Sequence, residues 1–366
     1  MPRPGQHARS GHGPPGRSAP GLAGRAVTRV TRHRLGFAVK VLADGGLPSH
    51  DTRRWQSGPH LRTSLAALRR ILDHLDRIDV RMYRMASALA PYASHPDLPQ
   101  FHDQVAECAP ELAAVGELAR QRDIRLSTHP GQYTVLNSER EEVRAVAVAE
   151  LEVQAELLDA LGLGREAVVV LHVGSAAGGR RAALDRFRAG LELLSERARA
   201  RLVIENDDRA FGVVDVVELA RRTGLRVVFD VLHHRCHDPE GIDDAGALAA
   251  ALDTWPAEVV PKVHYSSPRL DVEMRRVRAG RRVERRLVLP QLRAHADLVD
   301  PIGFEHFLRD TVRGRDFDIM LEAKAKDLAL HRLRGQLAKR GLPTRHGRLE
   351  LEARSIAGRA EGVDAR

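Results

Sequence analysis

Short apolar runs recur along the chain, each ending in a polar or charged residue and separated from the next by room for a helix. The plainest is Leu202-Val203-Ile204, which leads directly into Glu205. A run of β-branched and aliphatic residues of this length is typical of a strand buried on both faces of a parallel sheet. The pattern predicts eight strands, at residues 34–39, 80–85, 124–129, 168–172, 201–205, 227–230, 259–264 and 318–322.

Helical periodicity fills the intervals between these runs. Between the first two strands, for example, Leu61, Leu65, Leu68 and Leu72 recur at the spacing of one helix face. The same reasoning predicts helices at residues 60–78, 101–121, 139–161, 181–200, 214–223, 245–252 and 303–312. Eight alternating strands and helices with right-handed crossovers close into a (β/α)8 TIM barrel, so we expect this fold over residues 34–330.

Composition and charge set the two ends of the chain apart from the predicted barrel. Residues 1–34 hold seven arginines and no acid, and removing them from the formal charge of +9 leaves +2 for the rest. We expect residues 1–33 to be a disordered basic tail, because a Pro- and Gly-rich segment buries too little apolar surface to fold. It is either dispensable or a non-specific arm for nucleic acid. Residues 331–366, polar and arginine-rich, are expected to form a loosely attached extension.

The compartment follows from what the sequence lacks. No apolar run approaches the roughly 20 residues of a membrane span, and the start has no apolar core of a secretory signal. The two cysteines, Cys108 and Cys236, form no CxxC motif and fit a reduced compartment. We therefore expect a cytoplasmic protein that is monomeric and has no membrane partner.

The residues that end the strands are those that bind divalent metals. Because a parallel barrel brings the carboxyl ends of its strands to one face, these side chains should converge there. Burying so many acids without compensation would be costly, and cations are the natural compensation. A set of imidazoles and carboxylates without thiolates suits Zn, Mn or Fe. The expected strand-end ligands are His129, His172, Glu205, Asp230, His264 and Glu322.

One member of this set has a special place, and two further positions extend it. Glu205, near the middle of the series, is the best candidate to bridge two ions, and paired ions would activate a water for an in-line phosphoryl displacement. His233, one turn after Asp230, is a further ligand candidate, whereas His234 is expected in the core. His295, with Asp297 close behind, could cap a third ion; the alternative is a surface pair.

An arginine-rich insertion follows the seventh strand. Residues 269–286 carry eight arginines and three acids, and the insertion lies on the same barrel face as the ligand candidates. A solvated charged hairpin is one interpretation. Its position beside a metal site favours the other, which is phosphate binding. The arginines expected to bind DNA are Arg275, Arg276, Arg281 and Arg282.

Together these residues resemble the ultraviolet damage endonucleases, relatives of endonuclease IV among the TIM barrels, over about residues 34–326. The motifs that carry the resemblance are Ala93-Ser94-His95-Pro96, Leu126-Ser127-Thr128-His129-Pro130-Gly131-Gln132-Tyr133, Leu171-His172-Val173-Gly174, Ile204-Glu205-Asn206-Asp207-Asp208, Asp230-Val231-Leu232-His233-His234, Pro261-Lys262-Val263-His264, His295-Ala296-Asp297 and Leu321-Glu322-Ala323-Lys324-Ala325-Lys326. Each motif is short, but their order and spacing together are specific.

The resemblance implies a DNA repair enzyme that nicks damaged double-stranded DNA immediately 5′ of a photoproduct or other distorting lesion, so initiating excision. It implies two or three divalent ions, usually Mn²⁺, with Zn²⁺ or Mg²⁺ as alternatives, held by the eight metal-site residues already named. His95 and Lys262 would lie in or beside the cluster as catalytic residues with Glu205, with Lys262 assisting the charge and geometry of the site. Gln132 and Tyr133 resemble residues that probe the duplex at the lesion.

Three alternatives remain open at this point. The first is an apurinic endonuclease of the endonuclease IV type, which shares the site but cuts at a different lesion. The second is a TIM-barrel sugar isomerase or epimerase, although an arginine-rich loop suits a polyanion better than a neutral sugar. The third is a catalytically silent DNA-binding protein, which would have no use for a retained set of metal ligands.

Overall fold

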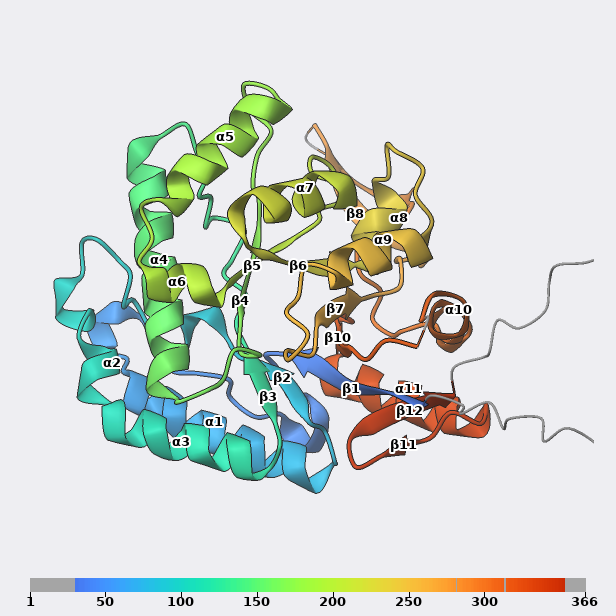
Figure 1. Cartoon of the computed structure of the whole chain (residues 1–366), viewed down its shortest axis with the longest axis horizontal. Coiled ribbons are helices and arrows are strands. Elements are labelled where there is room, and N and C mark those ends of the chain that lie inside the picture. Colours follow the sequence, from blue (N-terminus) through green and yellow to red (C-terminus); the bar gives the residue numbers. More distant parts are fainter. Residues whose placement is uncertain (1–29, 281, 313, 353–366) are drawn as a thin grey trace, which may run out of the picture.

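The computed structural model describes residues 30–280, 282–312 and 314–352. Its strands lie in the middle and its helices surround them (Figure 1). The parallel strands are β1 (Val30–Ala38), β2 (Met82–Arg84), β3 (Arg125–Ser127), β4 (Val169–His172), β5 (Leu202–Glu205), β6 (Arg226–Asp230), β7 (Lys262–Tyr265) and β10 (Asp318–Leu321).

Pairing between these strands runs around a ring. β1 pairs with β2 and β10, β2 with β3, and the series β4–β5–β6–β7–β10 completes the other side. Between β3 and β4 the contact is a single bridge, in which the Thr128 amide donates to the Val168 carbonyl and the Val170 amide to the Thr128 carbonyl, both at 3.0 Å. The predicted eight-stranded barrel is confirmed.

Helices cover the outside of the barrel. They are α1 (Leu61–Arg77), α2 (Gln104–Glu107), α3 (Ala109–Gln121), α4 (Glu141–Ala160), α5 (Arg180–Leu191), α6 (Glu196–Arg201), α7 (Val213–Thr223), α8 (Val231–Cys236), α9 (Asp244–Leu252), α10 (Pro301–Thr311) and α11 (Lys326–Lys339). The helix predicted at 181–200 is in fact two, because Ser195 caps α6 by accepting from the Ala198 amide and so restarts the helix there. No helix in the described ranges is long and apolar enough to cross a bilayer.

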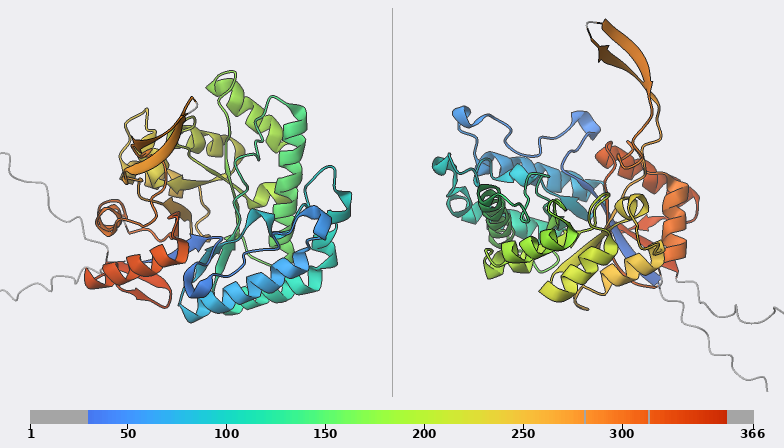
Figure 2. Two further views of the ribbon diagram at one scale, coloured as in Figure 1. Left: turned by 180° about the vertical axis from the view of Figure 1, so that it is seen from behind. Right: turned by 90° about the horizontal axis from the view of Figure 1, so that it is seen from above.

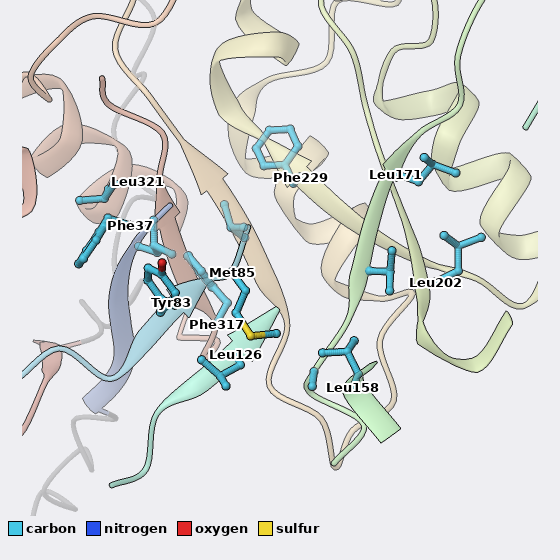
Figure 3. Close-up of a cluster of buried hydrophobic side chains, with 14 of the residues drawn as sticks. Phe37, Tyr83, Met85, Leu126, Leu158, Leu171, Leu202, Phe229, Phe317 and Leu321 are labelled. Atoms are coloured by element: carbon cyan, nitrogen blue, oxygen red, sulfur yellow. The ribbon is translucent and has the colours of Figure 1, made fainter. Parts of the chain in front are cut away.

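The main core lies between strands and helices. Alternate side chains of each strand, such as Phe37, Leu126, Leu171 and Phe229, point outward and pack under the helices (Figure 3). Inside the barrel the middle layer is small and β-branched, with Val170, Val203 and Val228 fully buried. The outer core fixes the strands, and the inward positions at their carboxyl ends are left for the site.

The amino end of the barrel interior is filled by charge. Arg125 donates to Asp318 Oδ2 at 2.9 Å, and Arg34 reaches the same oxygen at 3.0 Å. The Trp255 ring lies near two guanidinium groups, those of Arg125 at 5.9 Å and Arg226 at 5.1 Å from its centroid. This end is closed by ion pairs and stacking, which leaves the carboxyl end as the open one.

The segment after residue 330 corrects our expectation of a loose extension. Leu333 and Leu337 of α11 are buried, and β12 (Arg348–Glu352) pairs antiparallel with residues 30–34 of β1 and with β11 (Thr344–Arg345). Residues 331–352 are therefore part of the packed structure, and ordered strand begins at Val30 rather than after residue 33. Residues 1–29 and 353–366 lie outside the described residues, so the predictions for those parts stay predictions.

The arginine-rich insertion forms a two-stranded antiparallel hairpin of β8 (Glu273–Ala279) and β9 (Arg282–Val288). It stands away from the barrel as an arm (Figure 2, right). It leaves the barrel after β7 and returns to the segment that carries His295, so it rises from the carboxyl-terminal face.

Candidate metal centre

Glu205 lies at the middle of a cluster of strand-end side chains. It ends β5, where the register places His172 of β4 beside it, and the next strands bring Asp230 of β6 into register with His264 of β7. The side chains of Glu205, Asp230 and His264 are fully buried. Register alone thus gathers residues that are far apart in the sequence.

The two oxygens of Glu205 face different imidazoles. Oε2 lies 3.1 Å from His129 Nε2 and 3.6 Å from His172 Nε2. Oε1 lies 2.7 Å from His264 Nδ1 and 3.8 Å from His233 Nδ1. Glu205 therefore joins two groups of side chains, which is the arrangement that a bridging carboxylate needs.

Two sets of potential ligands share this carboxylate. In one, atoms of His129, His172 and Glu205 lie within 4.8 Å of one another. In the other, the same limit encloses atoms of Glu205, Asp230, His264 and Glu322. Both sets consist of imidazole nitrogens and carboxylate oxygens, a mixture that Mn²⁺, Zn²⁺ and Fe²⁺ accept.

Unpartnered atoms show that the residues fit a metal. Among the described residues, Asp230 Oδ2 and His264 Nε2 are buried without a hydrogen-bond partner. His129 gives a second sign: its Nδ1 lies 3.1 Å from the Pro130 carbonyl, which can only accept, and its Nε2 faces the Glu205 carboxylate. A neutral imidazole has one proton and cannot donate to both, so a cation between His129 and Glu205 resolves the conflict.

Electrostatics in the cluster point the same way. Burial opposes ionisation of Glu205, but the neighbouring His264 and His172 imidazoles outweigh it and hold its pKa well below the usual range. Burial and the nearby Glu205 and Glu322 raise the pKa of Asp230 to about 7, despite His233. Burial lowers the pKa of His129 to about 4. Several carboxylates thus compete for too little positive charge, which a divalent cation would supply.

Asn206 positions two of the predicted ligands, Asp230 and His233. Its side-chain amide donates to the Asp230 carbonyl at 3.0 Å and accepts from the Asp230 amide at 2.9 Å. The His233 ring donates from Nδ1 to the Asn206 carbonyl at 3.0 Å, and Asp230 Oδ1 caps α8 by accepting from the His233 amide at 2.7 Å. One asparagine therefore orients both Asp230 and His233.

The third part of the cluster surrounds Glu322. His264 Nδ1 lies 3.6 Å from Glu322 Oε1, and His295 Nδ1 lies 3.8 Å from Oε2. A backbone bridge between Pro268 and His295 holds the latter in place. Arg84, at the end of β2, donates to Glu322 Oε1. Asp297, which we had paired with His295, is exposed.

The two proposed accessory residues lie in different surroundings. Lys262 is fully buried two positions before His264 and donates from Nζ to Ser127 Oγ at 2.9 Å; burial, with Arg84 and Arg125, lowers its pKa well below the usual range. His95 is exposed, and its Nδ1 accepts from the Asp97 amide at 3.2 Å. No contact among the described residues joins His95 to the cluster, so its catalytic role stays a prediction.

The candidate DNA-contacting residues are exposed. Gln132 and Tyr133 lie in the loop after β3 that begins with His129, and Tyr133 is 82% exposed. Arg275, Arg276 and Arg282 lie on the hairpin, while Arg281 falls outside the described residues. An aromatic ring this exposed has no packing role and is free to stack on a partner.

Two residues that contact the cluster escaped the sequence analysis. Arg84 stands two residues after Met82, on the same face of a short strand, and looks like an ordinary strand-end arginine in the sequence. Asn206 follows Glu205 directly, and an amide placed just after a strand-end acid was the available signal.

Known proteins similar to this chain agree with one another. The sequence model of the family described as UV-endonuclease UvdE matches residues 59–352. A UV DNA damage endonuclease of Bacillus velezensis is 32% identical over 76% of this chain and 80% of its own length. One of Bacillus cereus strain B4264 is 29% identical over 76% of this chain and 82% of its own length.

Solved structures give the same result. The crystal structure of SacUVDE matches with a TM-score of 0.69 and 29% sequence identity, over 84% of this chain and 99% of that one. A D-tagatose 3-epimerase-like protein matches with a TM-score of 0.50 at 14% identity over 84% of this chain. The second likeness shows the barrel fold alone.

Proposed function

The chain belongs to the UV-endonuclease UvdE family, and on this basis we propose that it is a DNA endonuclease that cuts damaged double-stranded DNA on the 5′ side of a photoproduct or other distorting lesion. Its product would be the nick from which excision repair starts. The observation that carries the proposal within this chain is the sharing of Glu205 between two sets of potential ligands.

The metal site we propose consists of the eight residues that the sequence named. They are His129, His172, Glu205, Asp230, His233, His264, His295 and Glu322. Two or three divalent ions, most suitably Mn²⁺, would activate a water and stabilise the oxygens of an in-line phosphoryl displacement. Within the protein, Glu205 would hold the two sets together, and Asn206 would orient Asp230 and His233 toward them.

Other charged residues would prepare the site for a phosphodiester. Arg84 secures one oxygen of Glu322 and lowers its pKa against the effect of burial, so this carboxylate stays ionised and in place. Lys262, beneath His264, is held by Ser127 and would assist the charge balance of the cluster.

Recognition of the lesion would fall to the loop after β3. Base–aromatic stacking contributes about 1–3 kcal/mol per base, and a damaged base step is easier to open than an intact one. The exposed Tyr133, with Gln132 beside it, is the pair we propose to enter the duplex. The arginines of the hairpin would hold the phosphate backbone.

Incision of ultraviolet-irradiated plasmid in the presence of Mn²⁺ tests the proposal. We expect conversion of supercoiled to nicked plasmid with irradiated DNA, and little with unirradiated DNA. A plasmid with abasic sites but no photoproducts serves as a second substrate. Preference for that plasmid would make the activity apurinic, and nicking of neither would contradict the proposal.

A further inference from the structure

The two faces of the β8–β9 hairpin differ in charge. In its antiparallel register, directly opposed residues point to the same side, and successive pairs alternate between the two sides. Arg275 opposes Arg286 and Val277 opposes Glu284, which places these pairs on one face together with Glu273 and Val288. The intervening pairs, Met274 with Leu287, Arg276 with Arg285 and Arg278 with Val283, form the other face.

The first face, here called the paired face, neutralises most of its own charge. Arg275 donates to Glu273 Oε2 at 2.7 Å, and Arg286 donates to Glu284 Oε2 at 3.0 Å. Arg282, near the tip, is its third arginine. To reach a phosphate, Arg275 and Arg286 would have to give up or share carboxylate partners that they already hold.

At its base the paired face turns toward the protein. Glu273, Arg275 and Val288 line a small cavity together with Gln291 and Ala294 of the returning segment. Glu273 also forms an ion pair with Arg269, which precedes the hairpin. The contacts at the base of the arm therefore use this face.

The other face, here called the open face, consists of Met274, Arg276, Arg278, Val283, Arg285 and Leu287. It carries three arginines and no acid, and among the described residues none of these arginines has a carboxylate partner. Met274, Val283 and Leu287 are each more than half exposed. An isolated two-stranded sheet is only marginally stable in water, and this one also exposes apolar side chains between cations.

We propose that the open face is the DNA-binding surface of the arm, with Arg276, Arg278 and Arg285 on backbone phosphates of duplex DNA beside the incision site. The inference rests on the proposed function for the identity of the polyanion. Charge complementarity selects the face: among the described residues, all three of its guanidinium groups lack a carboxylate partner, whereas two of the three on the paired face are bonded to glutamates. The three apolar side chains would pack against deoxyribose between the phosphate contacts.

This assignment changes which arginines matter. The sequence favoured Arg275, Arg276, Arg281 and Arg282, chosen from one continuous run. Strand alternation separates Arg275 and Arg282 from Arg276, because neighbours along a strand point to opposite sides. Arg278 and Arg285 take their place as phosphate contacts.

The hairpin supplies its own matched control, since each face carries three described arginines. One variant, Arg276→Thr/Arg278→Thr/Arg285→Thr, removes those of the open face. The other, Arg275→Thr/Arg282→Thr/Arg286→Thr, removes those of the paired face. Both lower the net charge by the same amount, and threonine suits an exposed strand. Binding to an undamaged duplex is measured across a range of salt concentrations with EDTA present, so the readout does not depend on incision.

The salt dependence of binding distinguishes the faces. The slope of log K against log salt should fall by about 0.9 per lost phosphate contact, or roughly 2.7 for the open-face variant, and by less than about 1 for the paired-face variant. Equal falls, or no fall in either, would overturn the assignment. So would a wild-type dimer in sedimentation that the open-face variant converts to monomer, because a second copy would then occupy this face.

A separate outcome concerns the proposed function. If the wild-type protein nicks no damaged plasmid but the two faces still differ in salt slope, the function is wrong and the DNA-binding face stands. If the wild-type protein nicks irradiated plasmid and the two variants lose equal amounts of salt slope, the proposed function stands and the assignment of the DNA-binding face is wrong. Both variants should unfold at the wild-type temperature when followed by circular dichroism, which verifies that they are folded.

Discussion

The proposed metal ligands come from strand ends, a helix and a loop spread between His129 and Glu322, whereas the described arginines of the hairpin come from residues 275–286 alone. Both groups belong to the carboxyl-terminal face of the barrel. The ligands are buried or partly buried and are positioned by strand register and by neighbours such as Asn206. The described arginines of the hairpin are exposed, and the pairing register of β8 and β9 decides which way they point.

This difference separates two kinds of requirement. Chemistry at a phosphodiester needs atoms fixed to within a fraction of an ångström, which only a closed and packed framework provides. Binding a DNA backbone needs positive charge at roughly the right distance from the phosphates, and such contacts tolerate small changes in side-chain position. Changes in the cluster should therefore act sharply on incision, and changes in the arm should act gradually on affinity.

The largest effect should come from Glu205→Gln. Losing the shared negative charge while keeping the shape should reduce incision by more than about 100-fold, since even residues that only support metal ligands contribute 10–100-fold. Bound metal, measured by elemental analysis, should fall, and DNA affinity should change little. Glu258→Gln, a surface carboxylate before β7, is the control. Wild-type incision by Glu205→Gln would remove Glu205 from the centre.

A smaller effect is expected for Asn206→Ala. Both backbone groups of Asp230 lose their partner, so the free energy of unfolding should fall by about 1–3 kcal/mol and incision by roughly 10–100-fold. Asn137→Ala is a matched control, because Asn137 also makes two hydrogen bonds to the backbone of a single residue, Ser175. If Asn137→Ala lowers metal content as much, Asn206 has no special link to the cluster.

Tyr133→Ala should alter selectivity instead of rate. Loss of a base–aromatic stack of about 1–3 kcal/mol should reduce the ratio of damaged to intact incision by roughly one to two decades. Tyr133→Phe keeps the ring and should keep the ratio. The measurement uses matched oligonucleotides with and without a cyclobutane dimer, and an unaltered ratio in Tyr133→Ala would contradict the probing role. Metal content should be unchanged in both variants.

Deletion of residues 1–29 should have the smallest effect. It removes five arginines but no described strand and no proposed ligand. Thermal stability and incision at saturating DNA should be retained, and at most the affinity at low salt should fall. A protein that no longer folds after this deletion would show that the segment has a structural role.

The strands and most of the cluster could be predicted from sequence because their signals are local. A buried strand is an apolar run, and a proposed ligand such as Glu205 or His264 stands at its end, so each strand can be recognised by itself. The closed topology then follows from chain connectivity. The six candidate ligands at strand ends could therefore be found without any information about the rest of the molecule.

What sequence could not provide depends on contacts between distant parts. Arg84 acquires its role only because β2 and β10 both flank β1 and bring it to Glu322. Residues 348–352 form a strand whose partner is the start of β1. The two hairpin faces require the register of β8 on β9, which a run of arginines does not reveal.

The pairing of β1 with β10 has a consequence for biosynthesis. Residues 35–37 bond to residues 319–321, so the first strand leaves the ribosome long before its second neighbour is translated. At about 5–20 residues per second this wait lasts on the order of tens of seconds. Glu322 follows that late strand directly, so the chain completes its cluster only when the barrel closes. A nascent chain released early would lack this ligand and, under the proposed function, would be unable to nick the genome.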